Sequence, residues 1–317
     1  MSQVVAIVVT HNRKELLSTC LESICKQTLA PDAIYIIDNH SEIDTAEMLL
    51  SYHFIPNLPD RNADQDLVLT SLIPSYGGKD IRINYVYKCV NDGGAGGFYA
   101  GMVAAYRDGY EWLWMMDDDG IPAEDGLEQL LAGAHTHHLD YANALVVSIQ
   151  DRHSLSFGWE RVRRTMDDFT DVDIIPNVAN PFNGTLINRR IPEKIGFIKK
   201  EMFILGDEME YLYRSLSNGF SVATVAKSIH YHPSEKGKLG LVFPGCRRFL
   251  ILIYENNRGV IYYRNIGYIE YTYKGKKATC KLFIKYSIYF ILRLRFSEYK
   301  VFVQSFIKGC RNRFDKQ

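Results

Sequence analysis

The sequence predicts an α/β protein: a doubly wound, mostly parallel sheet flanked by helices, followed by a helical extension rich in basic and aromatic residues. Three observations predict this class. Apolar runs of strand length alternate with helical spacing over the first 120 residues. An acidic triplet, Asp117-Asp118-Asp119, directly follows one of these runs. Aromatic and basic residues accumulate after residue 246. With 47% hydrophobic and 23% charged residues, the 317-residue chain can bury a large core.

The chain opens with a β-α-β pattern. Residues 4–9 form a continuous apolar run, typical of a parallel strand buried on both faces. Leucines and cysteines at helical spacing follow over 16–24, and 33–37 form a second strand. Such units place their strands parallel and are nearly always right-handed. Residues 52–80 are polar and interrupted by Pro and Gly, which predicts a long loop or insertion.

The alternation continues toward the triplet. A third strand is expected over 81–90, a helix over 98–108, and a strand over 111–116 that ends in the acids. The later elements are less regular. They are a helix near 127–134, a strand at 144–149, an exposed charged loop at 151–175, an apolar segment at 183–187, a helix at 203–214 and an apolar stretch at 220–226. We place a domain boundary between residues 245 and 246, where the composition changes.

Charge is unevenly distributed although the total is zero. From Tyr271 to Gln317, twelve Lys and Arg face two acids, a net charge of +10. Lys and Arg interrupt the apolar stretches of this tail, so we expect no transmembrane helix. Two alternatives stay open: an amphipathic region at an anionic membrane surface, or a helical pair packed on the main domain with a solvated basic face.

Composition also predicts the compartment. The six cysteines show no metal-ligand spacing, and Met1-Ser2-Gln3 leads into the first strand without a basic, signal-like segment. We expect a reduced, cytoplasmic protein, peripheral on the inner face of the cytoplasmic membrane if the tail binds lipid. Nothing in the pattern indicates a nucleic-acid partner.

The triplet is the strongest functional signal. On an extended backbone Asp117 and Asp119 point the same way, so both can meet one cation. Carboxylate oxygens suit Mg²⁺ or Mn²⁺, above all when substrate phosphates complete the shell. Asp118 would point elsewhere and contact a donor or hold the turn. The alternative is a solvated acidic turn, because Asp119-Gly120 is also turn chemistry.

A glycine cluster precedes the triplet by about twenty residues. Gly93, Gly94, Gly96 and Gly97 lie between a strand and a helix, where close backbone approach and a helix amino terminus favour an anion. The cluster matches neither the dinucleotide GxGxxG pattern nor a Walker loop, and a flexible turn is the alternative. Together with the acids, it suggests a nucleotide whose diphosphate is bound to a metal.

Other polar residues have two interpretations each. Asp38 ends a strand and can accept hydrogen bonds from a ribose or base, or simply form a turn. Asp207 and Glu208 start a helix, where they can act as a general base or as partners of the helix dipole. Glu210 is expected to pair with Arg214, one turn later. Either His230 or His232 can complete a carboxylate-rich metal site.

These elements, in this order, resemble the family 2 glycosyltransferases of the GT-A fold over nearly the whole chain. Val8-Val9-Thr10-His11-Asn12-Arg13 is similar to the family's V-T-Y-N-R opening, with His11 in place of Tyr. Asp38-Asn39-His40-Ser41 resembles its D-N-x-S segment, and the triplet its D-x-D metal motif. Gly206 to Glu210 resembles the catalytic-base segment with Glu208 at the base position, and Ser228 to His232 favours His232 as third ligand.

Within the family, Asn91 to Phe98 with the acidic triplet most resembles galactofuranosyltransferases, and rhamnosyltransferases come next. Residues 306–314 resemble their closing D-G-x-x-G-R-F. Residues 254–258 occupy the place of a Y-x-x-R-N stretch, with the order of Arg and Asn disturbed.

The resemblance implies an inverting, metal-dependent transfer of galactofuranose from a UDP-linked donor to a hydroxyl of a bacterial surface glycan. Rhamnosyl transfer from dTDP-rhamnose and a noncatalytic nucleotide- or glycan-binding protein are the alternatives. Residues 1–245 would be the transferase domain, with a donor half to about 120 and an acceptor half beyond. The acceptor would be lipid-linked or an oligosaccharide, and no oligomeric state is implied. The implied donor-binding residues are Thr10, Asn12, Arg13, Asp38, Asn91, Gly93, Gly94, Gly96, Gly97 and Asp118; the metal ligands are Asp117, Asp119 and His232; the catalytic residues are Glu208 and Asp207; and the acceptor-binding residues are Trp114, Asn183, Gly184 and His230.

Overall fold

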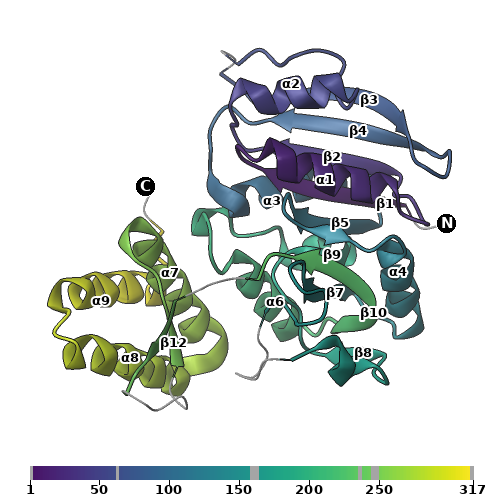
Figure 1. Cartoon of the computed structure of the whole chain (residues 1–317). Helices are drawn as coiled ribbons and strands as arrows, with labels where there is room; N and C mark the ends of the chain where they lie inside the picture. The colour runs from purple at the N-terminus through teal and green to yellow at the C-terminus, as the bar shows by residue number, and fades with distance from the viewer. Residues whose placement is uncertain (1–2, 62–63, 158–163, 235–237, 244–249, 315–317) are drawn as a thin grey trace. The chain divides into compact units, whose positions relative to one another are not determined.

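The computed structural model describes residues 3–61, 64–157, 164–234, 238–243 and 250–314 (Figure 1). The chain forms two compact units. The first is Met1–Lys200 with Ser215–Glu235, and the second is Glu201–Arg214 with Lys236–Gln317. The expected boundary between residues 245 and 246 lies outside the described residues.

A ten-stranded sheet organises the first unit. Its centre is a parallel set in the order β4 (Asp80–Tyr87), β2 (Ala33–Asp38), β1 (Val4–Thr10) and β5 (Trp112–Asp117). β9 (Asn183–Asn188) runs antiparallel between β5 and β7, and β7 pairs in parallel with β10. The remaining strands are β3 (Leu67–Pro74), β6 (Ile121–Pro122), β7 (Tyr141–Ser148), β8 (Ile174–Pro176) and β10 (Val222–His232).

Helices cover both faces of the central strands, because successive strand residues point to opposite faces. α1 (Lys14–Cys25) buries Leu17 and Cys20 in a cluster with Ala6 and Val8. α3 (Gly93–Arg107) lies against Ile7 and Val9, which alternate with Ala6 and Val8 and point to the other face. The predicted doubly wound, mostly parallel architecture is confirmed. The other helices of this unit are α2 (Ile43–Ser51), α4 (Gly126–Thr136) and α5 (Arg190–Ile195), with a 3₁₀ turn at Met166–Phe169.

Two expectations about local structure were wrong. Residues 52–80 are not one loop, because β3 pairs antiparallel with β4 along its full length. The partial burial of β3 alternates, as an edge strand requires, but the exposed face carries the apolar Val68 and Leu72, so the sequence shows no alternation. α3 begins at Gly93 rather than at residue 98, so the glycines form its first turns. Helix packing offsets their low helix propensity: a Cβ on Gly97 would lie 2.5 Å from Val9 Cγ1.

The second unit contains the predicted C-terminal helices and is built on an aromatic core. Tyr263, Tyr286, Phe290, Phe302 and Phe306 are buried together there. Its elements are the hairpin β11 (Lys238–Leu241) and β12 (Leu250–Ile253), α7 (Asn256–Ile269), a π-helical turn at Glu270–Lys274, α8 (Gly275–Leu292) and α9 (Phe296–Cys310). Its segment Glu201–Arg214 contains most of α6 (Asp207–Ser217). Among the described residues, every helix is too short or too polar to cross a membrane.

Candidate active site

The carboxyl ends of the parallel strands bring the predicted residues of the first unit to one edge of the sheet. Thr10 at the end of β1 is in register with Asp38 at the end of β2. Val9 is in register with Asp117 at the end of β5. Ligands of open α/β sheets bind at this edge, so the topology places the donor and metal candidates where such a site is expected.

The acidic triplet converges on His232. Ligand atoms of Asp117, Asp119 and His232 all lie within 4.8 Å of one another, close enough to share a cation. The backbone from Asp117 to Asp119 is not extended, as the sequence analysis expected it to be. The chain turns after Asp117, whose carbonyl accepts a hydrogen bond from the Gly120 amide at 3.2 Å. The turn, rather than strand alternation, brings Asp119 back toward Asp117.

The histidine is oriented for a cation. His232 Nδ1 lies 2.7 Å from the Pro233 carbonyl oxygen, which can only accept, so Nδ1 carries a proton. In the neutral ring Nε2 then offers a lone pair, and it lies 3.2 Å from Asp119 Oδ1. Asp119 Oδ1 is buried and faces this nitrogen. Two facing acceptors fit a divalent metal between them.

Without a metal the same two groups form an ion pair. Burial lowers the pKa of His232, but the hydrogen bond and charge of Asp119 outweigh it, and the pKa is raised overall. Burial raises the pKa of Asp119, and His232 and Arg13 outweigh it in the opposite direction, so that pKa is lowered. Proton and metal therefore compete for His232, as at any site with imidazole and carboxylate ligands.

Asp118 joins two strands instead of pointing to the cation. It is 3% exposed, and its carboxylate accepts hydrogen bonds from Thr10 Oγ1 at 2.8 Å and Arg13 Nη1 at 3.2 Å. Arg13 Nη1 also lies 3.0 Å from Asp119 Oδ2. Burial raises the pKa of Asp118 to about 6 despite these partners. Thr10, Arg13 and Asp118 thus form one connected group that fixes the turn.

The end of β2 and the loop that follows it are connected to β4 and to the loop after β1. Asp38 is buried and accepts from Tyr85 Oη and the Ser41 amide, both at 2.7 Å. Burial raises its pKa above the usual range. Asn12 Oδ1 accepts a hydrogen bond from the backbone N–H of Glu42, and the backbone N–H of Asn12 donates to Ser41 Oγ. These contacts hold the loops together from within.

Asn39 is a residue that the sequence did not single out. Its Nδ2 donates to Asn91 Oδ1 at 3.0 Å and to the Gly93 carbonyl at 2.9 Å. It therefore ties the loop after β2 to the glycine cluster. The Asp-Asn-x-Ser resemblance was the available signal, but it drew attention to Asp38 alone.

The glycines are required by close neighbours and by backbone conformation. Gly93 has φ of +77°, a conformation that L side chains rarely adopt. A Cβ on Gly96 would overlap with the Asp92 carboxylate, which pairs with Lys88 at 2.9 Å. Gly94 has no neighbour within 4 Å of an added Cβ. The first turn of α3 is therefore close-packed on one side and open on the other.

The proposed acceptor residues are buried in the first unit. Trp114 is 1% exposed in the core, as the packing alternative expects. His230 is fully buried, and its burial lowers its pKa to about 3, so the ring is neutral. A Cβ on Gly184 would lie 3.0 Å from His230 Nδ1, and Asn183 is 1% exposed. All four positions are therefore buried in this unit.

The catalytic candidates begin α6 in the second unit. Asp207 is buried, whereas Glu208 is partly exposed and accepts a bond from the Gly206 amide at 3.3 Å. The expected pair between Glu210 and Arg214 is confirmed at 2.9 Å. Tyr273 Oη also donates to Glu210 at 2.6 Å, which fixes this acid to the π-helical turn.

Arg264 and Asn265 were missed by the sequence analysis. Both are buried in α7, and both bind carbonyls just before α6. Asn265 Nδ2 donates to the carbonyls of Met202, Ile204 and Leu205 at 2.9–3.0 Å. Arg264 Nη2 donates to the Met202 carbonyl at 3.1 Å. The Arg-Asn order sought at 254–258 occurs here, so a search a few residues further on would have found it.

Arg264 and Asn265, which we call the clasp, hold an unusual backbone. Phe203 and Leu205 have φ of +68° and +66°, and Gly206 has φ of +114°. Such conformations cost free energy in residues other than glycine and persist only where the surroundings fix them. Arg264 and Asn265 supply that restraint directly before Asp207 and Glu208.

Comparison with known proteins identifies the class. The sequence model described as "Glycosyl transferase family 2" matches residues 5–203. The chain therefore belongs to glycosyl transferase family 2, and it is a glycosyltransferase with a GT-A fold, as the sequence resemblance implied.

Particular relatives refine this assignment. Galactofuranosyltransferase GlfT1 of Mycolicibacterium smegmatis is 28% identical over 302 residues, which cover 92% of this chain and 91% of the relative. Among solved structures, S. aureus TarS 1–349 in complex with UDP-GlcNAc has a TM-score of 0.59 at 13% identity, covering 97% of this chain and 81% of that one. GalNAc-T7 with UDP, GalNAc and Mn²⁺ has a TM-score of 0.57 at 14% identity, covering 86% of this chain and 49% of that one.

Proposed function

We propose that this protein is an inverting, metal-dependent galactofuranosyltransferase. It would move galactofuranose from UDP-galactofuranose onto a hydroxyl of a lipid-linked or oligosaccharide acceptor in a bacterial surface glycan. The observation that carries the metal dependence is the convergence of Asp117, Asp119 and His232 at the sheet edge. The choice of sugar is supported by the similarity to galactofuranosyltransferase GlfT1.

In this proposal Asp117, Asp119 and His232 hold Mn²⁺ or Mg²⁺. A bound divalent cation neutralises charge that develops on a departing diphosphate. Thr10, Arg13 and Asp118 keep the turn that carries Asp119 in place, through the bonds between them. Asp38, Asn12 and Asn91 line the same sheet edge with the first turn of α3, and they would bind the nucleotide. A helix amino terminus favours the negative charge of a phosphate.

Glu208 is proposed as the general base that takes the proton of the acceptor hydroxyl. Partial exposure leaves its carboxylate open to an acceptor, whereas the neighbouring Asp207 is buried and Glu210 is held by Arg214 and Tyr273. An accessible carboxylate can accept a proton from a hydroxyl within hydrogen-bond reach. Asp207 would then act by fixing the start of α6.

Release of UDP from UDP-galactofuranose in the presence of Mn²⁺ tests the proposal. Asp119→Ala should abolish turnover, because it removes a cation ligand and the partner of His232. Glu208→Gln should lower kcat by about 10²–10⁴-fold with little effect on the donor KM, since a base acts on the chemical step. Undiminished turnover of Asp119→Ala would remove the argument for the metal.

A donor panel separates the alternatives. Preference for dTDP-rhamnose would make the protein a rhamnosyltransferase that uses the same residues. Metal-dependent binding of UDP without transfer to any acceptor would favour a noncatalytic nucleotide- or glycan-binding protein. The partly exposed Glu208 at the start of α6 favours the enzyme.

A further inference from the structure

The second unit contains a groove that plays no part in the chemistry proposed above. It has a volume of about 590 Å³ and is lined by α8 and by the segment that follows β11. We call it the α8 groove and define it by its lining residues: Val242, Phe243, Lys276, Lys277, Cys280, Lys281, Ile284, Lys285 and Ile288. The volume is within the range of pockets that hold small molecules or a segment of lipid chain.

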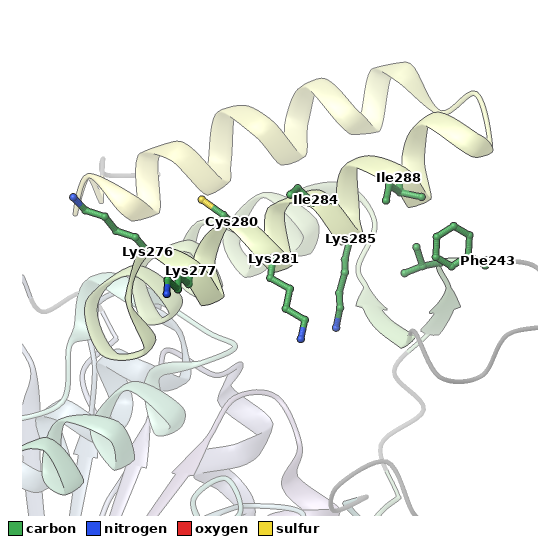
Figure 2. Close-up of a pocket in the computed structure, with 9 residues that line it drawn as sticks. Phe243, Lys276, Lys277, Cys280, Lys281, Ile284, Lys285 and Ile288 are labelled. Carbon is green, nitrogen blue, oxygen red and sulfur yellow. The ribbon is translucent and has the colours of Figure 1, made fainter.

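The groove combines an apolar floor with a basic rim. Ile284 and Ile288 are one helical turn apart, and Phe243 lies beside Ile288 (Figure 2). Lys277, Lys281 and Lys285 follow one another at the same four-residue interval, so they form a second stripe along α8. In Figure 2, Lys281 and Lys285 extend from the same side of the helix.

The groove is held in shape by its own unit. Arg293, at the end of α8, donates from Nη2 to the Leu241 carbonyl at 2.6 Å and from Nη1 to the Val242 carbonyl at 3.4 Å. Val242 packs in the aromatic core with Tyr289 and Phe290. The segment that presents Phe243 is therefore fixed to the helix that presents the lysines.

Three of the rim lysines have no ion-pair partner among the described residues of the unit. No described carboxylate lies within ion-pair distance of Lys276, Lys277 or Lys281. The acids Glu210, Glu255, Glu270 and Glu298 pair with other basic residues. An anionic partner would complement this charge, and the apolar floor requires that the same partner carry hydrocarbon.

Exposed apolar side chains continue the floor beyond the groove. Ile284 is 55% exposed, and Ile291 and Leu292 follow it toward the end of α8, on the side expected from helical spacing. Leu294 and Phe296 at the turn into α9 are 74% and 59% exposed. Exposed apolar side chains on a helix that also carries lysines are typical of a surface that contacts lipid headgroups and the upper acyl chains.

We propose that the α8 groove is a binding site for anionic phospholipid of a bilayer surface. The phosphate would be bound by Lys277 and Lys281, which are one helical turn apart, while Lys276 would add positive charge nearby, and an acyl chain would lie on Ile284, Ile288 and Phe243. Charge complementarity favours anionic over zwitterionic lipid, and the apolar floor favours a lipid over a free phosphate or nucleotide. The site is independent of the donor sugar proposed above.

Cosedimentation of the full chain with vesicles tests the site. Binding is expected to phosphatidylcholine vesicles that contain phosphatidylglycerol, and to weaken as salt is raised. The variant Lys276→Gln/Lys277→Gln/Lys281→Gln should bind roughly 100-fold more weakly, since each lysine near an anionic surface contributes about fivefold. The matched control, Lys300→Gln/Arg311→Gln/Arg313→Gln, removes the same charge from the same unit outside the groove and should bind within a few-fold of the parent. Equal losses in both variants would overturn the site.

Cys280 gives a second, local measurement. It is an exposed thiol in the groove, and its alkylation can be followed by peptide mapping without replacing other cysteines. Vesicles with phosphatidylglycerol should slow alkylation of Cys280 but not of Cys89, and phosphatidylcholine alone should not. Equal protection of Cys280 by inorganic phosphate or UDP would overturn the lipid assignment in favour of a soluble anion. Protection that depends on protein concentration in the absence of vesicles would overturn it in favour of a second copy of the chain. UDP release with a soluble acceptor tests the transferase separately.

Discussion

Replacing Asp118 by Asn should stabilise the metal-free protein at neutral pH. Asp118 is 3% exposed, and burial raises its pKa to about 6 from an ordinary value of 3.8. The hydrogen bonds of Thr10 and Arg13 only partly offset that burial. A difference of about two pH units corresponds to roughly 3 kcal/mol between the two protonation states. The ionised carboxylate therefore destabilises the folded state.

The sign of the pH dependence follows from proton binding. Between about pH 4 and pH 6 the folded state keeps the Asp118 proton while the unfolded chain loses it, so stability decreases as pH rises through this window. Asn cannot ionise, and it can still accept from Arg13 and exchange a hydrogen bond with Thr10. The variant should therefore gain up to about 3 kcal/mol at neutral pH and almost nothing near pH 4.

Thermal unfolding in EDTA is the assay, with both proteins scanned from acidic to neutral pH. The first unit is of a size for which 1 kcal/mol shifts Tm by about 2–4 °C, so a rise of roughly 6–12 °C is the upper limit at neutral pH. Other titrating groups are shared by both proteins and cancel in the difference. A variant that is less stable at neutral pH, or a difference that does not depend on pH, would refute the reasoning about burial.

Three further predictions concern packing, the clasp and the metal. Gly97→Ala should lower the free energy of unfolding, measured by urea titration, by about 1–3 kcal/mol, because its Cβ would lie 2.5 Å from Val9 Cγ1. In the same assay Gly94→Ala, whose Cβ meets nothing within 4 Å, should be neutral or slightly stabilising. Asn265→Ala leaves the carbonyls of Ile204 and Leu205 without their donor, whereas the Met202 carbonyl keeps Arg264, and the change should cost roughly 2–5 kcal/mol in the same titration; an unchanged midpoint would show that the backbone before α6 needs no restraint. His232→Ala should weaken Mn²⁺ binding at least about tenfold by calorimetry, and His53→Ala, at an exposed surface position, should leave it unchanged.

The strands and the edge that carries the site followed from local pattern. The apolar runs at 4–9, 33–37 and 111–116 predicted buried parallel strands because only a two-sided core accepts such runs. The residues that end those strands were therefore expected at one edge, and the register of Thr10 with Asp38 and of Val9 with Asp117 agrees with that expectation. Residues 52–80 were misassigned because an edge strand with one solvated face carries a weaker pattern.

The sequence by itself determined the fold class, the family and the acidic, glycine-rich and helix-start segments, because each depends on neighbours within a few residues along the chain. Only the tertiary structure decided what Asp118 does, since its partners Thr10 and Arg13 are more than one hundred residues away. The same is true of Asn265, which restrains a backbone about sixty residues earlier. A turn, not strand alternation, brings Asp119 toward Asp117, and β10 brings His232 to both. Local pattern fixes which backbone forms, whereas buried polar groups are satisfied by whichever partners the packed chain brings near.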